Sequence, residues 1–212
     1  MGFEDEKRRA GEAAAELVED GMLLGLGTGT TVAHFLAALA RRSLRLRCVA
    51  TSLQTETAAR ELGLAVEPFD ELERLDLAVD GADQVARDGW LVKGGGAAHT
   101  REKVVAASAD RFVVIVSSDK LVESIRPPVP LEILSYGVRS TLARAAPAEL
   151  RDVPPSPDGG LIADYTGPVG DPGELAAWLS AVPGVVEHGL VPPALVAEIL
   201  VGGGEEVERR TV

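Results

Sequence analysis

The 212-residue chain has very few of the residues that build disulfide-rich or aromatic-rich proteins. Cys48 is its only cysteine, and aromatic residues make up 4% of the sequence. A disulfide framework within one chain is therefore excluded, which is typical of proteins from a reducing compartment. Cys48 lies in the apolar run 46–50, so we expect a buried strand residue and not a reactive thiol. With 46% hydrophobic residues, the core must consist mainly of Ala, Val and Leu.

The chain also lacks an excess of positive charge and any long apolar run. Its formal net charge is −12, which disfavours general binding to nucleic acid or to an anionic membrane. No apolar run approaches the ~20 residues that a membrane helix needs. The first residues are acidic and do not resemble a signal peptide. We therefore expect a soluble, cytoplasmic protein with no nucleic-acid and no membrane partner.

Metal-ligating residues are scattered. The three histidines and the single cysteine show no ligand spacing, so we expect no metal site and no metal-dependent chemistry.

Apolar strand patterns alternate with helical patterns in the first part of the chain. Strand patterns occupy 22–26, 46–51, 75–79 and 112–116, and helical patterns occupy 4–19, 32–39, 54–62 and 100–109. This alternation predicts an α/β fold with an open, mostly parallel sheet. Ligands bind at the carboxyl ends of the strands in such sheets.

The pattern changes near residue 126, where three prolines fall within 127–130. Residues 127–197 predict a small α+β subdomain with the order strand–helix–strand–strand–helix–strand. Residues 196–201 and 207–212 could rejoin the main sheet. The predicted domains are therefore 1–126 plus 198–212, and 127–197.

A glycine- and threonine-rich loop follows the first predicted strand. Glycines at this place let backbone N–H groups approach an anion, and the following helix N-terminus adds positive potential. Walker A would require a lysine after the loop, and a nicotinamide-binding loop would require glycine at position 30 and an acid after the second strand. Neither is present, so we predict a small phosphorylated metabolite and no nicotinamide cofactor. The predicted binding residues are Gly27, Thr28, Gly29, Thr30 and Thr31.

The stretch 79–103 holds the residues best suited to proton transfer. It contains two nearby acids, a lysine followed by three glycines, and a glutamate on the next helix. Three consecutive glycines indicate backbone that passes close to another group. Acids, a lysine and open backbone amides are what proton transfer on a small anion requires. These residues are Asp80, Asp83, Lys93, Gly94, Gly95, Gly96 and Glu102.

Three segments together resemble the ribose 5-phosphate isomerase family of the A type. They are GLGTGTT at 25–31, VDGAD at 79–83 and KGGGAAHTREK at 93–103. The resemblance implies an isomerase without a cofactor that interconverts D-ribose 5-phosphate and D-ribulose 5-phosphate in the pentose phosphate pathway. It also implies a Rossmann-like domain, a ferredoxin-like subdomain that makes oligomer contacts, and a homodimer, with a tetramer as the alternative.

The same resemblance implies roles for individual residues. Glu102 would be the base that moves a proton between C1 and C2, although the residue pattern alone would also suit an exposed helix glutamate. Asp80 and Asp83 would open the sugar ring and carry a proton between oxygens, and we expect one of the two to hold a proton near neutral pH. Lys93 and the three glycines would bind the enediolate oxygen or the hydroxyls.

Two further lysines, Lys7 and Lys120, match family positions and could reach the phosphate or the hydroxyls. Lysines on an acidic protein are otherwise usually solvated. His99 departs from the family pattern, in which an apolar residue is commoner.

Two other functions remain open at this point. One is a sugar-phosphate sensor without catalysis. The other is a different enzyme of the same fold, such as a CoA-transferase or an amino-sugar phosphate deaminase.

Overall fold

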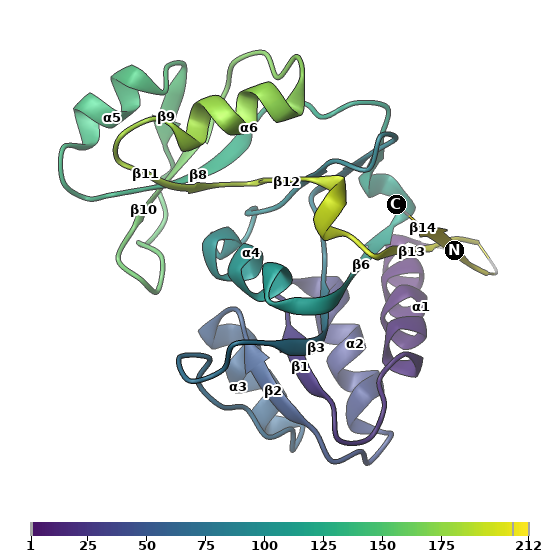
Figure 1. Cartoon of the computed structure of the whole chain (residues 1–212). Helices are drawn as coiled ribbons and strands as arrows, with labels where there is room; N and C mark the ends of the chain where they lie inside the picture. Colours follow the sequence, from purple (N-terminus) through teal and green to yellow (C-terminus); the bar gives the residue numbers. More distant parts are fainter. Residues whose placement is uncertain (1, 205, 212) are drawn as a thin grey trace. The chain divides into compact units, whose positions relative to one another are not determined.

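The computed structural model describes residues 2–204 and 206–211. The chain divides into two compact units (Figure 1). Unit 1 comprises Met1–Ala82, Arg101–Leu121 and Ala194–Val212, and unit 2 comprises Asp83–Thr100 and Val122–Pro193.

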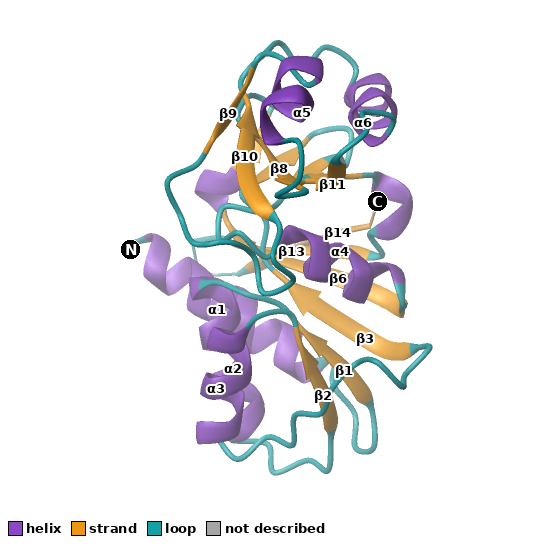
Figure 2. Ribbon diagram, turned by 90° about the vertical axis from the view of Figure 1, so that its left-hand side faces the viewer, coloured by secondary structure: helices purple, strands orange, loops and turns teal. Residues whose placement is uncertain are grey.

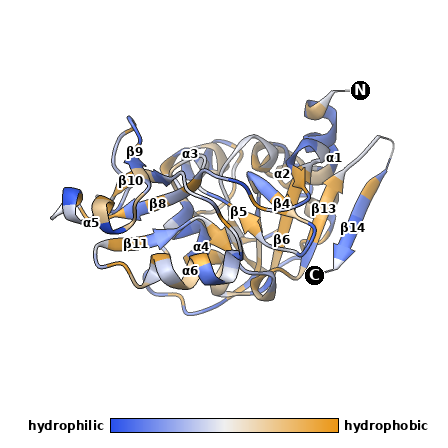
Figure 3. Cartoon of the chain, turned by 90° about the horizontal axis from the view of Figure 1, so that it is seen from above, coloured by the Kyte–Doolittle hydropathy of each residue, from blue (hydrophilic) through white to orange (hydrophobic). Residues whose placement is uncertain are grey.

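Unit 1 is built on a six-stranded sheet with the order β14-β13-β6-β3-β1-β2. Its strands are β1 (Leu23–Leu26), β2 (Arg47–Ala50), β3 (Leu75–Asp80), β6 (Ala109–Ser117), β13 (Glu198–Gly202) and β14 (Val207–Thr211). The five strands from β2 to β13 run parallel, and only β14 is antiparallel. The buried strands are nearly all apolar, as both faces of a parallel sheet are covered. Figure 3 shows that β14, at the edge, is largely hydrophilic beside the hydrophobic β13.

Helices cover both faces of this sheet. They are α1 (Phe3–Glu16), α2 (Thr30–Ala40), α3 (Leu53–Glu61) and α4 (His99–Ala107). Leu24 and Leu26 of β1 pack in one core cluster with α1 and α2. Gly25 points to the opposite face, where a Cβ atom would lie 2.4 Å from Val105 of α4. The α4 helix therefore packs closely on the face opposite α1, as Figure 2 also shows.

The helix starts follow from local sequence. Three acidic residues in the first turn of α1 stabilise the positive end of that helix. Ser52 caps α3 by accepting a hydrogen bond from the Thr55 N–H at 3.1 Å. Gly29 precedes α2 with φ 125°, a conformation that other residues rarely adopt.

The order of the strands places the site. β1 lies between β2 and β3, so the chain leaves β1 in one direction and later returns to its other side. Such a topological switch point opens a crevice at the carboxyl ends of the two strands, where ligands bind. Leu26 pairs with Ala50 on one side and with Val79 on the other, so the three strands end at the same level.

Unit 2 contains a ferredoxin-like sheet with the order β11-β8-β10-β9, all antiparallel. Its elements follow the predicted order and are β8 (Val129–Ile133), α5 (Val138–Arg144), β9 (Ala148–Leu150), β10 (Leu161–Tyr165), α6 (Pro172–Ser180) and β11 (Val185–His188). Asp171 caps α6 and Pro172 occupies its first turn, which explains why the helix begins there. Leu175 and Leu179 of α6 pack on Leu131 and Ala163 of the sheet.

A second small sheet belongs to unit 2, except for Leu121 at the start of β7. It has the order β12-β5-β4-β7, and its strands are β4 (Gln84–Ala86), β5 (Leu91–Val92), β7 (Leu121–Val122) and β12 (Leu190–Val191). Within residues 2–204 and 206–211 there are also two short 3-10 helices, η1 (Ser118–Lys120) and η2 (Pro193–Leu195).

The predicted fold class is confirmed: a largely parallel central sheet accompanies an antiparallel α+β unit. The predicted domain boundaries stay a prediction, and the two compact units differ from them slightly over residues 122–126 and 194–197 and most over residues 83–100. The sequence assigned these residues to the larger domain. They belong to unit 2 because β5 pairs with β12 and β4 pairs with β5. Residue 212, the last of the predicted strand 207–212, lies outside the described residues.

Candidate functional site

In unit 1, the glycine loop after β1 lies directly against Asp80 at the end of β3. The Thr28 N–H donates to Asp80 Oδ1 at 3.0 Å, and the Gly81 N–H donates to the same oxygen at 2.7 Å. Asp80 is only 2% exposed. A Cβ atom on Gly27 would lie 2.0 Å from the carboxyl carbon of Asp80, so only glycine fits there. The structure thus brings two sequence-predicted elements together, the threonine loop and the first acid.

Hydroxyl groups surround Thr28, and the sequence prediction did not include them as site residues. Thr28 Oγ1 lies 2.8 Å from both Thr51 Oγ1 and Ser52 Oγ, and 3.2 Å from Thr55 Oγ1. Thr55 donates onward to the Gly27 carbonyl at 2.8 Å. The available signal was positional: these hydroxyls follow β2, which neighbours β1. The cluster therefore holds the glycine loop in place through its internal hydrogen bonds.

The start of α2 supplies backbone N–H groups at the same place. The first helical hydrogen bond runs from the Ala33 N–H to the Gly29 carbonyl at 3.0 Å. The amides of Thr30 and Thr31 therefore precede the hydrogen-bonded turn, at the positive end of the helix. Gly29 and Thr30 are exposed. This geometry suits a phosphate.

Lys7 and Lys120 belong to elements that meet near the carboxyl edge of the sheet. Glu6 Oε2, the neighbour of Lys7, accepts from both the N–H and the hydroxyl of Ser118 at 2.7 Å. Lys7 pairs with Glu4 at 2.6 Å, and Lys120 pairs with Asp119 at 3.2 Å. Each lysine is therefore paired with a nearby acid.

The Asp119 carboxyl group is held ionised beside Lys120. Partial burial raises its pKa, but hydrogen bonds from Ser117 and Lys120 and the charge of Lys120 lower it by more, so the net shift is downward. The Asp119 carboxyl group therefore stays ionised at neutral pH.

Glu102 lies in the first turn of α4 and is 4% exposed. This burial argues against the alternative of a solvated helix glutamate, because burying a carboxylate costs free energy and glutamate is rarely found in this state. α4 packs on Gly25 through Val105, one turn further along the same helix. The close approach of α4 to β1 therefore depends on glycine in that strand.

In unit 2, Asp83 lies against the triple glycine. The Asp83 N–H donates to the Val92 carbonyl at 2.7 Å, and Asp83 Oδ2 accepts from the Gly95 N–H at 2.7 Å. A Cβ on Gly95 would lie 2.6 Å from Asp83 Oδ1. The Gly95 N–H thus helps to orient the Asp83 carboxylate.

The glycines form a turn. The Ala97 N–H donates to the Gly94 carbonyl at 3.1 Å, and Gly94 has φ 106°. A Cβ on Gly94 would lie 2.8 Å from His99 Nδ1, so the buried His99 fills the space beside this glycine. His99 therefore packs against the glycine turn.

Lys93 is 3% exposed at the end of β5. Its N–H donates to the Gly189 carbonyl at 2.8 Å, and a Cβ on Gly189 would lie 2.2 Å from the Lys93 carbonyl oxygen. Glycine at 189 therefore lets the subdomain strand approach Lys93 closely. The burial of Lys93 is unlike that of a solvated lysine at a strand end.

Neither a metal cluster nor a membrane helix occurs within residues 2–204 and 206–211. No group of three or more His, Cys, Asp or Glu side chains there could hold a metal ion. In the same residues, no helix is long and apolar enough to cross a membrane.

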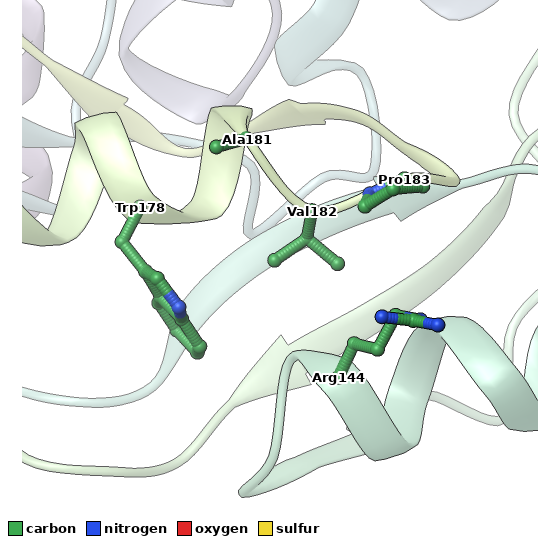
Figure 4. A pocket seen from close by; sticks show the side chains of 5 residues that line it. All are labelled: Arg144, Trp178, Ala181, Val182 and Pro183. Carbon is green, nitrogen blue, oxygen red and sulfur yellow. The ribbon is translucent and has the colours of Figure 1, made fainter.

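A separate hollow of about 250 Å³ lies within unit 2, at the ends of α5 and α6 (Figure 4). Its lining residues are Arg144, Trp178, Ala181, Val182 and Pro183. None of the residues predicted from the sequence lines it.

Comparison with known proteins identifies the family. The family model of ribose 5-phosphate isomerase A (phosphoriboisomerase A) matches residues 47–206. The chain belongs to this family. It is similar to ribose-5-phosphate isomerase A of Natronomonas pharaonis, with 45% identity over 99% of this chain and 98% of the relative. It is equally similar to that of Caulobacter vibrioides strain CB 15, with 45% identity and 99% coverage of both chains.

Two solved structures are also similar to this chain. Ribose 5-phosphate isomerase A from Neisseria gonorrhoeae superposes with a TM-score of 0.92 at 28% identity, covering 99% of this chain and 97% of the other. A D-ribose-5-phosphate isomerase in complex with phospho-erythronic acid superposes with a TM-score of 0.93 at 32% identity, covering all of both chains. The fold inferred from the strand order is thus the fold of the family.

Proposed function

We propose that the protein interconverts D-ribose 5-phosphate and D-ribulose 5-phosphate through a cis-enediolate, within the non-oxidative pentose phosphate pathway. Family membership supports this reaction. One structural observation carries most weight: the open N-terminus of α2 and the buried Asp80 share the glycine loop, through the Thr28 N–H bond at 3.0 Å. The proposed anion site and the proposed proton-carrying group thus meet at one turn.

Glu102 is proposed as the base at carbon. It removes the proton from C2 of the aldose. The electron pair of the C2–H bond then forms the C1–C2 double bond, the π electrons of the C1 carbonyl move onto O1, and the result is the enediolate. The same proton, returned to C1, gives the ketose. The burial of Glu102 suits this role, since it keeps the carboxylate and the reacting carbon away from bulk water.

The oxygens require their own proton transfer, because O1 gains a proton and O2 loses one. We assign this transfer, and the earlier ring opening, to Asp80 and Asp83. Lys93 is proposed to stabilise the negative oxygen, with the N–H groups of Gly94 and Gly96 assisting. Gly95 is proposed to orient Asp83, since its N–H donates to that carboxylate.

The phosphate is proposed to bind at the start of α2. Its partners would be the backbone and hydroxyls of residues 27–31, with Lys7 and Lys120 supplying positive charge. A solved relative at 32% identity is a complex with phospho-erythronic acid, which supports a phosphorylated sugar derivative as the ligand of this chain.

We also propose that the protein acts as a homodimer in the cytoplasm, with a tetramer as the alternative. Exposed apolar residues in unit 2 support an oligomer contact there: Leu134 is 51% exposed, Tyr136 90% and Val186 45%. Val186 lies on β11, an edge strand of its sheet. Light scattering of the purified protein tests this proposal, and a monomeric mass at micromolar concentration would refute it.

A direct assay tests the reaction. Protein treated with EDTA and gel-filtered is incubated with ribose 5-phosphate, and ribulose 5-phosphate is followed by its ketose signal. We expect turnover that EDTA does not reduce and that phospho-erythronic acid inhibits competitively. Binding of ribose 5-phosphate without turnover would favour a sensor. Turnover only with an acyl-CoA or an amino-sugar phosphate would favour another enzyme of the same fold.

A further inference from the structure

Arg151, which follows β9 in unit 2, reaches the triple-glycine turn. Its Nη1 donates to the Gly94 carbonyl at 3.0 Å and to the Gly95 carbonyl at 3.3 Å. The other side of the guanidinium binds Asp164 of β10, with Nε 2.9 Å from Oδ2 and Nη2 2.5 Å from Oδ1. Arg151 thus joins the ferredoxin-like sheet to the loop that follows Lys93.

The pairing of β9 with β10 fixes the positions of Arg151 and Asp164 relative to each other. The Arg151 N–H donates to the Ile162 carbonyl at 2.9 Å, and Asp164 pairs with Glu149 in the same ladder. Arg151 and Asp164 are therefore diagonal neighbours on adjacent strands, within reach of long side chains. Their side chains are only 20% and 22% exposed. A fork-to-fork contact of this kind holds the guanidinium plane in one orientation.

The glycine turn is held from both sides as a result. The Gly95 N–H donates to Asp83, and the Gly95 carbonyl accepts from Arg151. The Gly94 carbonyl accepts from both Ala97 and Arg151. Glycine has the largest backbone freedom of all residues, so three in a row need external contacts to keep one conformation.

We propose that Arg151 is a positioning residue for the reaction: with Asp164 it fixes the glycine turn and so orients Asp83 and the amides beside Lys93. This inference rests on the proposed roles of Asp83 and of the glycine turn. Arg151 acts through these groups and does not itself touch the substrate.

A ligand-binding role for Arg151 is less consistent with its contacts. A hollow of about 500 Å³ adjoins the pair, and its lining includes Arg151, Asp164 and Leu150. A guanidinium carries five N–H donors, and four of them already serve Asp164, Gly94 and Gly95. One N–H group therefore remains for an anion in the hollow. The four contacts already made are those needed to hold the glycine turn.

Steady-state kinetics of three variants test the proposal. Arg151→Met removes the clamp, Arg151→Lys keeps the charge but loses the fork, and Asp164→Asn weakens the partner that orients it. We expect kcat for ribose 5-phosphate to fall roughly 10- to 100-fold in Arg151→Met, with a smaller change in KM, because misplacement of about 1 Å near reacting groups has this effect. Arg151→Lys and Asp164→Asn should give intermediate losses.

Two controls separate positioning from stability. Arg47→Met removes a similar fork from Glu67 (2.6 and 2.9 Å) at the start of β2, and it should leave kcat unchanged. A substrate deuterated at C2 should show an isotope effect on kcat in Arg151→Met at least as large as in the wild type, because the proton-transfer step becomes slower. A purely structural residue would lower the melting temperature and leave kcat and the isotope effect at wild-type values.

The proposal fails if folded Arg151→Met turns over within about twofold of the wild type. If that variant does not fold, wild-type kcat in both Arg151→Lys and Asp164→Asn refutes it equally. The wild-type protein, measured in the same assay, tests the proposed isomerase function separately from the role of Arg151. Turnover by the wild type supports that function whatever the variants show, and its absence would refute the function.

Discussion

Gly27→Ala gives a sharp test of how the glycine loop and Asp80 depend on each other. The new Cβ would lie 2.0 Å from the Asp80 carboxyl carbon and 2.1 Å from Oδ1, whereas ordinary contacts begin near 3.4 Å. The carboxyl group or the loop must therefore move by about 1.4 Å. Such a shift should lower kcat about 100-fold. It should also lower the free energy of unfolding by about 1–3 kcal/mol through overpacking.

The assay is steady-state turnover of ribose 5-phosphate together with urea unfolding. Gly11→Ala is the matched control, since its Cβ would lie 2.6 Å from the Phe35 nitrogen at the contact of α1 with α2. It introduces a similar clash without touching Asp80, so it should lose stability and keep kcat. A folded Gly27→Ala protein with wild-type kcat would refute the reasoning, because Asp80 would then tolerate a displacement of this size.

Three further predictions concern the glycine turn, the two lysines and the single cysteine. Gly95→Ala should lower kcat with little change in KM, because its Cβ would lie 2.6 Å from Asp83 Oδ1; a pure KM effect in kinetics would contradict this. Lys7→Ala and Lys120→Ala should each raise KM for ribose 5-phosphate by roughly 10- to 100-fold, the value of a charged hydrogen bond, and unchanged KM would remove them from the phosphate site. Burial raises the pKa of the Cys48 thiol to about 12 from 9.0, so labelling with a thiol reagent at pH 8 should be roughly 10³-fold slower in the folded than in the urea-unfolded protein. Because the folded pKa is the higher one, the protonated thiol stabilises the fold below about pH 9, and this contribution is lost as the pH rises from 9 towards 12; equal labelling rates at pH 8 would contradict the burial.

The main sheet could be predicted because its strands carry a strong local pattern. The predicted strand 112–116 is the buried part of β6 without its last residue, Ser117, and the predicted strand 75–79 is β3 without its last residue, Asp80. The small sheet of unit 2 had no comparable signal. Its strands are two or three residues long, and their pairing depends on partners far along the chain, as between β5 and β12.

In the candidate site, too, some residues carry a local sequence pattern and others are brought in only by the fold. The threonine loop and Asp80 carry a chemical pattern that is readable in a short window, and the structure joins them through the Thr28 N–H. The hydroxyls of Thr51 and Ser52 could have been inferred from the neighbouring positions of β1 and β2. Arg151 had no local signal, because its contacts with Gly94 and Gly95 span more than 50 residues of sequence and exist only in the folded unit.

The most direct test of the account is the turnover of Glu102→Gln beside the wild type. Glutamine keeps the size of the buried side chain but cannot accept a proton from carbon. With ribose 5-phosphate in D₂O, the wild type should form ribulose 5-phosphate, and Glu102→Gln should be slower by roughly 10²–10⁴-fold with a similar melting temperature. A folded Glu102→Gln protein that isomerises ribose 5-phosphate at a near-normal rate would contradict the assignment of the carbon base.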